Sequence, residues 1–361
     1  MNTKHLLLTF DYELFLGAKS GTVDNCLIKP TNKLLAVLNK YNVKHSIFFV
    51  DTIYLLKLRS NGNANCQNDY TKLIKQLVNI LKQGHYIFPH LHTHWLDAVY
   101  SDSTNQWDLT NTNQYRFHQA NDDDKLYYFT SSIDLILDIQ KQAATNYPIN
   151  SYRAGGFCLQ PFVGFKPFFE TNNITNDFSV LSGFKGDGTI ANYNYTSAPK
   201  TPIYNFNNDV LKEEKQGAFT AFCISSINTK KWFYTKLIDK YNYLNNKNKT
   251  DGKSILVNAK TKQSLTKKYL KVESCNQMVS IELLATYNLK KHKNYFKHNS
   301  FMQFVSHPKM ILQHHLNVFD KFLKHTTLNY KIETNYTIIK NNLVPVNRVS
   351  NKQSYSHVDV L

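Results

Sequence analysis

Short apolar runs alternate with longer amphipathic runs along the first part of the chain. Residues 6–10, 46–50 and 86–88 have the character of buried strands, whereas residues 30–41 and 70–82 carry apolar side chains at helical spacing. The order strand, helix, strand, helix, strand favours parallel strands, because a parallel pair needs a long crossover connection. The sequence therefore predicts an α/β fold.

The same alternation continues, less regularly, toward the C-terminus. A polar insertion at residues 97–125 precedes a predicted helix at 131–144 and a strand that ends at 151–153. Further apolar strands are predicted at 219–224 and 301–305. Residues 193–284 mix Asn- and Lys-rich loops with two short β-like runs, at 254–257 and 278–284. We interpret this stretch as late elements of the same fold with insertions.

Residues whose side chains could act in catalysis or bind a metal follow the apolar strands, one strand after another. In a (β/α) barrel the C-terminal ends of the strands build the active site, so this placement favours a distorted barrel with loop insertions. No linker or internal repeat divides the chain, and residues 1–345 are predicted to form one domain. Residues 346–361 lack periodicity and are predicted to be a flexible tail.

The formal net charge of +17 raises the question of an anionic partner, such as nucleic acid, an acidic glycan or a membrane surface. The lysines are spread through Asn- and Tyr-rich sequence, without the aromatic-interleaved basic cluster typical of nucleic-acid binding. We therefore expect no nucleic-acid partner. The sequence shows neither a signal peptide nor an apolar run of about 18–20 residues that could span a bilayer, which predicts a cytoplasmic protein.

The five cysteines are scattered, odd in number and never arranged as CxxC. This argues against a disulfide framework and against a structural thiolate zinc site. Reduced thiols in a cytosolic protein are the expected state.

Two carboxylates follow the first predicted strand, in the sequence Thr9-Phe10-Asp11-Tyr12-Glu13. If the chain stays extended, Asp11 and Glu13 point to the same side. Such a pair can divide the work, one carboxylate binding a metal ion and the other acting as general base. The structural alternative is that Asp11 caps the next turn and Glu13 is solvated.

Three histidines fall within five residues after the third predicted strand: His90, His92 and His94. Neutral imidazole is a common metal ligand. In a turn or helix His90 and His94 would share a face, whereas in an extended strand all three would. The alternative is an incidental cluster in a chain with 14 histidines.

Two further motifs follow later strands. Arg153 precedes Gly155 and Gly156, and glycines allow close backbone approach to a ligand. The arginine could hold the carboxylate base in place and keep its pKa low, or could be a surface residue at a plain turn. His307 ends an apolar strand and is a candidate general acid, although a hydrogen-bonded core histidine is the common alternative.

Taken together, these motifs resemble the polysaccharide deacetylase family, also called the NodB-homology domain. The matching segments are TFDYE (9–13), GHYIFPHLHTH (84–94), RAGGF (153–157), NDFSVLSGF (176–184) and FVSH (304–307). One departure is Tyr12, which stands where the family usually has a second Asp. In the TFDxE variant the later acid takes the metal, which gives Glu13 that role.

The resemblance implies a distorted (β/α) barrel that hydrolyses the acetyl group of an N-acetylated sugar or surface-glycan precursor. The implied ligands of a divalent metal, zinc by preference, are Glu13, His90 and His94. For the reaction it implies Asp11 as base, Arg153 as its orienting partner and His307 as acid.

On the substrate side the resemblance implies that a backbone N–H near Gly156 stabilises the oxyanion, with Phe157 and His92 beside the substrate. Two other classes of function stay open. One is an amidohydrolase acting on a non-sugar amide with a site made of His90, His92 and His94. The other is a non-catalytic glycan-binding relative, with Tyr12 marking a decayed site.

Overall fold

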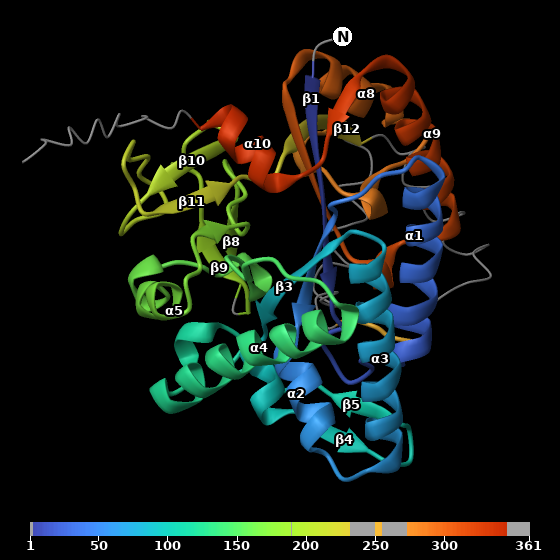
Figure 1. Cartoon of the computed structure of the whole chain (residues 1–361), viewed down its shortest axis with the longest axis vertical. Coiled ribbons are helices and arrows are strands. Elements are labelled where there is room, and N and C mark those ends of the chain that lie inside the picture. Colours follow the sequence, from blue (N-terminus) through green and yellow to red (C-terminus); the bar gives the residue numbers. More distant parts are fainter. Residues whose placement is uncertain (1–2, 189, 232–249, 255–272, 345–361) are drawn as a thin grey trace, which may run out of the picture.

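The computed structural model describes residues 3–188, 190–231, 250–254 and 273–344. Within these ranges the chain forms an α/β fold around one curled, half-barrel sheet of nine strands (Figure 1). All neighbouring strands of the sheet are parallel except one antiparallel pair at an edge. The predicted class, an α/β fold with a distorted (β/α) barrel, is confirmed.

The strands of the sheet are, in spatial order, β10 (Ile203–Phe206), β11 (Phe219–Phe222), β7 (Asn176–Asp177), β6 (Ser151–Ala154), β3 (Tyr86–Leu91), β2 (Ile47–Asp51), β1 (Thr3–Tyr12) and β14 (Phe301–Ser306). The short strand β15 (Lys331–Glu333) pairs with the first residues of β1. Three two-stranded hairpins lie outside the sheet: β4 (Val99–Ser101) with β5 (Gln106–Asp108), β8 (Lys185–Asp187) with β9 (Asn192–Asn194), and β12 (Ser226–Lys231) with β13 (Glu273–Met278).

The α-helices are α1 (Lys29–Lys40), α2 (Thr52–Ser60), α3 (Ala64–Lys82), α4 (Asp122–Ala143), α5 (Lys166–Thr171), α8 (Leu289–His298), α9 (Gln313–Asn329) and α10 (Tyr336–Leu343). Helices α2, α3 and α4 contact one another and β3, so they pack against the sheet around the strand that carries His90 (Figure 1). Among the described residues, no helix combines the length and apolarity needed to cross a membrane.

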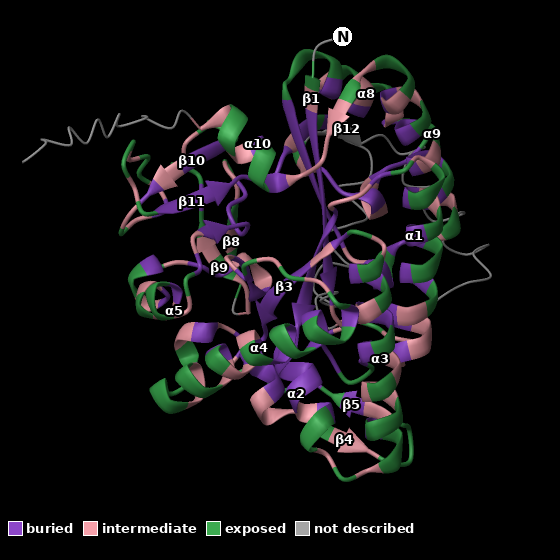
Figure 2. Cartoon of the chain, viewed as in Figure 1, coloured by how far each residue is buried: buried purple, intermediate pink, exposed green. Residues whose placement is uncertain are grey.

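The strands of the sheet centre are buried on both faces, as Figure 2 shows by colour. In β1, Leu6, Leu7 and Leu8 are at most 1% exposed. In a (β/α) barrel, helices cover the outer face of the sheet and side chains fill its inner face, so such strands appear in the sequence as continuous apolar runs rather than alternating ones. The apolar run predicted at residues 6–10 thus marks the middle of a longer strand that continues to the carboxylates.

Helix α4 begins at Asp122, well before the predicted residue 131. The side chain of Asn121 accepts a hydrogen bond from the backbone N–H of Asp124 at 2.7 Å and so caps the helix. Three aspartates in the first turn are also favourable next to the positive end of the helix dipole. Part of the predicted polar insertion is therefore the start of a helix.

The two β-like runs and the tail predicted for the later part of the chain do not become strands of the sheet in the described residues. The β-like run at 278–284 contains the last residue of β13 followed by a 3₁₀ turn, η6 (Ile281–Leu283), so it is not a strand of the sheet. Residues 255–257 and the predicted tail at 346–361 lie outside the described residues. Cys26, Cys66, Cys158 and Cys223 are buried and unpaired.

Candidate metal centre and active site

Asp11 lies near the C-terminal end of β1 and is held by a buried arginine. The Arg153 guanidinium, from β6, donates to the Asp11 carboxylate and, at 2.7 Å, to Thr9 Oγ1. Its Nε donates to the carbonyl of Phe178 at 3.0 Å, and its Cζ lies 4.3 Å from the centre of the Phe49 ring. Burial favours the neutral acid, yet Arg153 and nearby histidines outweigh it and hold the pKa of Asp11 below its usual value.

Tyr12, which stands between the two carboxylates, faces the other way. Its hydroxyl donates to the side-chain carbonyl of Gln76 on α3 at 2.5 Å, and the residue is 2% exposed. Successive residues of a strand point to opposite faces, so Tyr12 belongs to the core while Asp11 and Glu13 face the cavity. The departure from the family pattern at Tyr12 therefore leaves both carboxylates in place.

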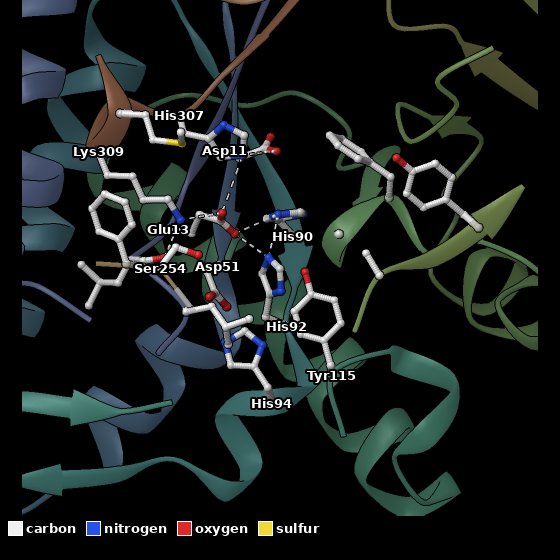
Figure 3. A pocket seen from close by; sticks show the side chains of 18 residues that line it. Asp11, Glu13, Asp51, His90, His92, His94, Tyr115, Ser254, His307 and Lys309 are labelled. Atoms are coloured by element: carbon white, nitrogen blue, oxygen red, sulfur yellow. Dashed lines mark hydrogen bonds and ion pairs between the residues drawn. The ribbon is translucent and has the colours of Figure 1, made fainter. Parts of the chain in front are cut away.

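Glu13, His90 and His92 bring three potential ligand atoms to one point (Figure 3). Glu13 Oε2 lies 3.3 Å from His90 Nε2 and 2.5 Å from His92 Nε2, and the two Nε2 atoms are 3.0 Å apart. Ligands of a tetrahedral zinc ion, at about 2.0–2.1 Å from the metal, lie about 3.3 Å from one another. Two of the three separations are thus close to those that one cation would impose, and the third, between Glu13 and His92, is shorter.

The tautomer of His90 is fixed by the backbone. Its Nδ1 lies 2.8 Å from the carbonyl oxygen of Arg153. Because a carbonyl can only accept, Nδ1 carries the hydrogen and Nε2 of the neutral ring presents a lone pair toward Glu13. Such a hydrogen bond to the distal nitrogen is the common support of a metal-binding histidine.

His92 reaches this position because Gly155 leaves room for it. A Cβ at Gly155 would lie 2.6 Å from the carbonyl oxygen of Leu91 and 2.8 Å from His92 Nδ1. The next residue, Gly156, has a φ of +58°, and a Cβ there would lie 2.5 Å from the hydroxyl of Tyr115. The paired glycines of the RAGGF motif therefore make space for two side chains of the cavity.

His94 lies outside the group formed by Glu13, His90 and His92. It belongs to the 3₁₀ turn η2 (Thr93–Asp97), and its ring stacks on Tyr115 with centroids 5.6 Å apart. The ring remains next to His92, with centroids 5.0 Å apart, and its Nδ1 is buried without a hydrogen-bond partner. The sequence-based ligand set of Glu13, His90 and His94 thus differs from the set of atoms that the fold brings together.

Lys309 forms an ion pair inside the site. Its Nζ lies 2.8 Å from Glu13 Oε1 and 2.5 Å from the carbonyl oxygen of Leu14. Although burial favours the neutral acid, Lys309 and the two imidazoles hold the pKa of Glu13 well below its usual value. The lysine takes one carboxylate oxygen and leaves Oε2 for the histidines.

His307 follows β14 and faces both carboxylates. Its Nε2 lies 3.5 Å from Asp11 Oδ2 and 3.7 Å from Glu13 Oε1, while its Nδ1 lies 2.8 Å from Glu282 Oε1. Burial alone would lower the pKa of His307, but the hydrogen bond to Glu282 and the charge of Asp11 raise it above its usual value. The imidazole therefore tends to keep a proton on the atom that faces the cavity.

These groups open into a cavity of about 440 Å³. Its other walls are largely apolar and include Leu14, Phe15, Leu16, Tyr115, Phe157, Tyr193 and Met310. A few converging polar groups at the base of an apolar hollow are typical of a small-molecule site. Gly156, Phe157 and His92, which the sequence placed beside a substrate, all line this cavity.

Four residues of the site were missed by the sequence analysis: Asp51, Tyr115, Glu282 and Lys309. Asp51 ends β2, accepts a hydrogen bond from the Trp95 indole at 2.5 Å and has its pKa raised by burial to about 6. Its position at a strand end was an available signal. Tyr115, Glu282 and Lys309 come from a loop, a 3₁₀ turn and the residues after a strand, and no local pattern marks them.

No family model and no curated protein matches the chain. Among solved structures, one from Mycobacterium smegmatis that is provisionally assigned to the polysaccharide deacetylases has a TM-score of 0.46 at 12% identity, and the match covers 94% of this chain and 90% of that one. A 4-alpha-glucanotransferase from Thermococcus litoralis has a TM-score of 0.46 at 10% identity, over 94% and 41%. The catalytic domain of a peptidoglycan N-acetylglucosamine deacetylase from Eubacterium rectale has a TM-score of 0.35 at 14% identity, over 92% and 88%.

Proposed function

We propose that this protein is a metal-dependent hydrolase that removes an acetyl group from an N-acetylated sugar or a surface-glycan precursor. The observation that carries the proposal is the convergence of two sets of groups. Glu13, His90 and His92 offer three ligand atoms at one point. Asp11 and His307, each held by its own buried partner, face the same cavity.

The residues present fit a divalent cation. Two imidazoles and one carboxylate are a known ligand set of catalytic zinc, which keeps a further position open. The two imidazoles are buried, the side chain of Glu13 is 12% exposed, and the fixed tautomer of His90 presents a lone pair. When bound, such an ion would lower the pKa of a water molecule and polarise the acetyl carbonyl. In this proposal His92 takes the ligand role that the sequence gave to His94.

Asp11 serves as the general base. Its lowered pKa keeps it ionised at neutral pH, and Arg153 occupies one side of the carboxylate. The other oxygen, Oδ2, faces His307. An attacking water placed between Asp11 and Glu13 can therefore pass its proton to Asp11.

His307 serves as the general acid. Glu282 accepts its Nδ1–H, so the proton on Nε2 is the one directed to the cavity. Without a proton, the amine would have to depart as an unstable anion. The Nε2–H of His307 supplies that proton. A backbone N–H near Gly156 stabilises the oxyanion, and Phe157 and Tyr115 line the space for the sugar.

Two measurements on purified protein test the proposal: metal content, and acetate release from N-acetylated sugars and sugar nucleotides. The wild type is expected to hold about one divalent ion per chain and to release acetate. Asp11→Asn is expected to keep the ion and to lose activity by about 10²–10⁴-fold, the usual contribution of a general base. An active Asp11→Asn protein, or one that has lost its metal, would contradict the assigned roles.

A further inference from the structure

Helix α4 presents one side to solvent along its whole length, and Figure 2 shows the colour of exposed residues recurring along it. Its other side is buried and packs against α2, α3 and β3. Leu126, Tyr127 and Leu137 on the outer side are 54%, 59% and 48% exposed. Single exposed apolar residues are common on protein surfaces, whereas several along one helix face mark a candidate contact surface.

The exposed positions of α4 recur at the spacing of a helix-packing face. They include a row that we call the outer row: Asp123, Tyr127, Thr130, Asp134, Leu137 and Lys141. Its steps of four and three residues are those of the a and d positions with which two helices pack together. Leu126 and Ile133 lie beside the outer row, one residue before Tyr127 and Asp134. Helix α4 thus carries a second packing face besides the one that it uses inside the fold.

The outer row reads the same in both directions. Its successive steps are four, three, four, three and four residues, so two copies of α4 can lie antiparallel with each position opposite another. Tyr127 then faces Leu137 of the second copy, which buries an apolar pair. Thr130 faces Asp134 of the second copy, where its hydroxyl can donate to the carboxylate. Because a two-fold axis repeats every contact, each of these pairs occurs twice.

The charges at the ends of the outer row favour the antiparallel arrangement. Asp123 stands at one end and Lys141 at the other, and neither forms an ion pair within the described ranges. The neighbouring Asp122, by contrast, already pairs with Lys125 inside the helix at 2.9 Å. An antiparallel pair brings Asp123 of each copy to Lys141 of the other, whereas a parallel pair would bring like charges together.

The size of this face sets the strength of the contact. Helix α4 has 22 residues, and a helix of that length is about 33 Å long and about 10 Å wide. A strip of that size covers about 330 Å² of each copy, well below the roughly 800 Å² per partner of a standard stable interface. The contact therefore suits a reversible dimer of copies that fold by themselves.

We propose that the outer row of α4 is the interface of a reversible homodimer, in which two α4 helices pack antiparallel across a two-fold axis. None of its residues lines the metal cavity. The proposal is therefore independent of the deacetylase function, and either one can fail without the other.

Sedimentation velocity of the purified chain, at concentrations from about 1 μM to about 1 mM, tests this interface. The fraction of dimer is expected to rise with concentration. Leu137→Glu should raise the dissociation constant by about 100-fold, about 10-fold for each of the two leucines that lose their apolar contact. Leu328→Glu is the matched control, because it alters a leucine of α9 that is 67% exposed, and it should leave the dimer unchanged.

Charge reversal tests the antiparallel pairing. Asp123→Lys and Lys141→Asp should each weaken self-association by about 10-fold, since each replaces two attractive contacts by two repulsive ones. In an equimolar mixture of the two variants, opposite charges meet at both ends of the helix pair. The mixture should therefore associate as tightly as the wild type, within about 2-fold.

A protein that stays monomeric throughout this range would overturn the proposal. So would a dimer that is indifferent to Leu137→Glu, or a mixture of the charge variants that associates no better than each variant alone. If Lys141→Asp strengthens association while Asp123→Lys weakens it, the acidic side of α4 binds a basic surface of another copy, and the two-fold arrangement is wrong.

Discussion

His90 donates its Nδ1–H to the backbone carbonyl of Arg153 at 2.8 Å, while the side chain of the same arginine binds Asp11. One residue of β6 thus supports a proposed metal ligand through its backbone and the proposed base through its guanidinium. Since the two contacts use different atoms, a substitution of the side chain separates them.

Replacing Arg153 by Met is expected to destabilise the protein by about 3–5 kcal/mol, because Asp11 would remain as a buried charge without a partner. The pKa of Asp11 in the folded protein lies below 3.8, so the ion pair contributes fully above that pH and is lost as the pH falls further. Urea unfolding at pH 7 measures the loss, which should shrink in an Asp11→Asn background. An equal loss in both backgrounds would mean that Asp11 is not the partner that matters.

Metal analysis of His92→Ala and His94→Ala distinguishes the two candidate ligand sets. The proximity of Glu13, His90 and His92 predicts that His92→Ala loses its metal ion, whereas His94→Ala retains it. His94 stacks on Tyr115, so its loss should lower stability rather than metal affinity. Retention of metal by His92→Ala together with loss by His94→Ala would restore the ligand set inferred from sequence.

Gly155→Ala should impair metal binding although it touches no ligand atom of the proposed site. Its Cβ would lie 2.8 Å from His92 Nδ1, so the imidazole must move. A change in the surroundings that orient a metal-binding histidine typically lowers metal affinity by about 10–100-fold. Competition with a chelator measures the change. Gly62→Ala is the control, since a Cβ there meets nothing within 4 Å, and an equal effect of both variants would contradict the steric explanation.

Glu282→Gln should shift the alkaline side of the pH–kcat profile to lower pH. The carboxylate of Glu282 raises the pKa of His307, so the imidazole keeps its proton to a higher pH in the wild type than it would otherwise. With the charge of Glu282 removed, only Asp11 and Glu13 still oppose the effect of burial, so the pKa of His307 falls. As an acid, His307 is active only below its pKa, so activity should fall off earlier. An unchanged alkaline limb would argue against His307 as the acid.

Much of the site follows from local sequence pattern. Asp11 and Glu13 share a face because strand residues alternate, and Tyr12 between them enters the core for the same reason. Arg153 and His307 end buried strands, and parallel strands bring such ends to one edge of the sheet. The structure brings these side chains together, and both rules can be applied to a sequence because they depend only on secondary structure and its direction.

The sequence by itself determined the parallel α/β fold and the strand ends that hold the candidate catalytic and metal-binding residues, since both follow from the periodicity of apolar residues. Only the tertiary structure decided which histidine joins His90 beside Glu13. The backbone is still extended at His92 and turns into a 3₁₀ helix at Thr93, which rotates His94 out of register. The positions of Lys309 and Glu282 were likewise decided by packing. Lys309 meets Glu13 from a distant part of the chain, and Glu282 meets His307 from a turn that no sequence pattern marks.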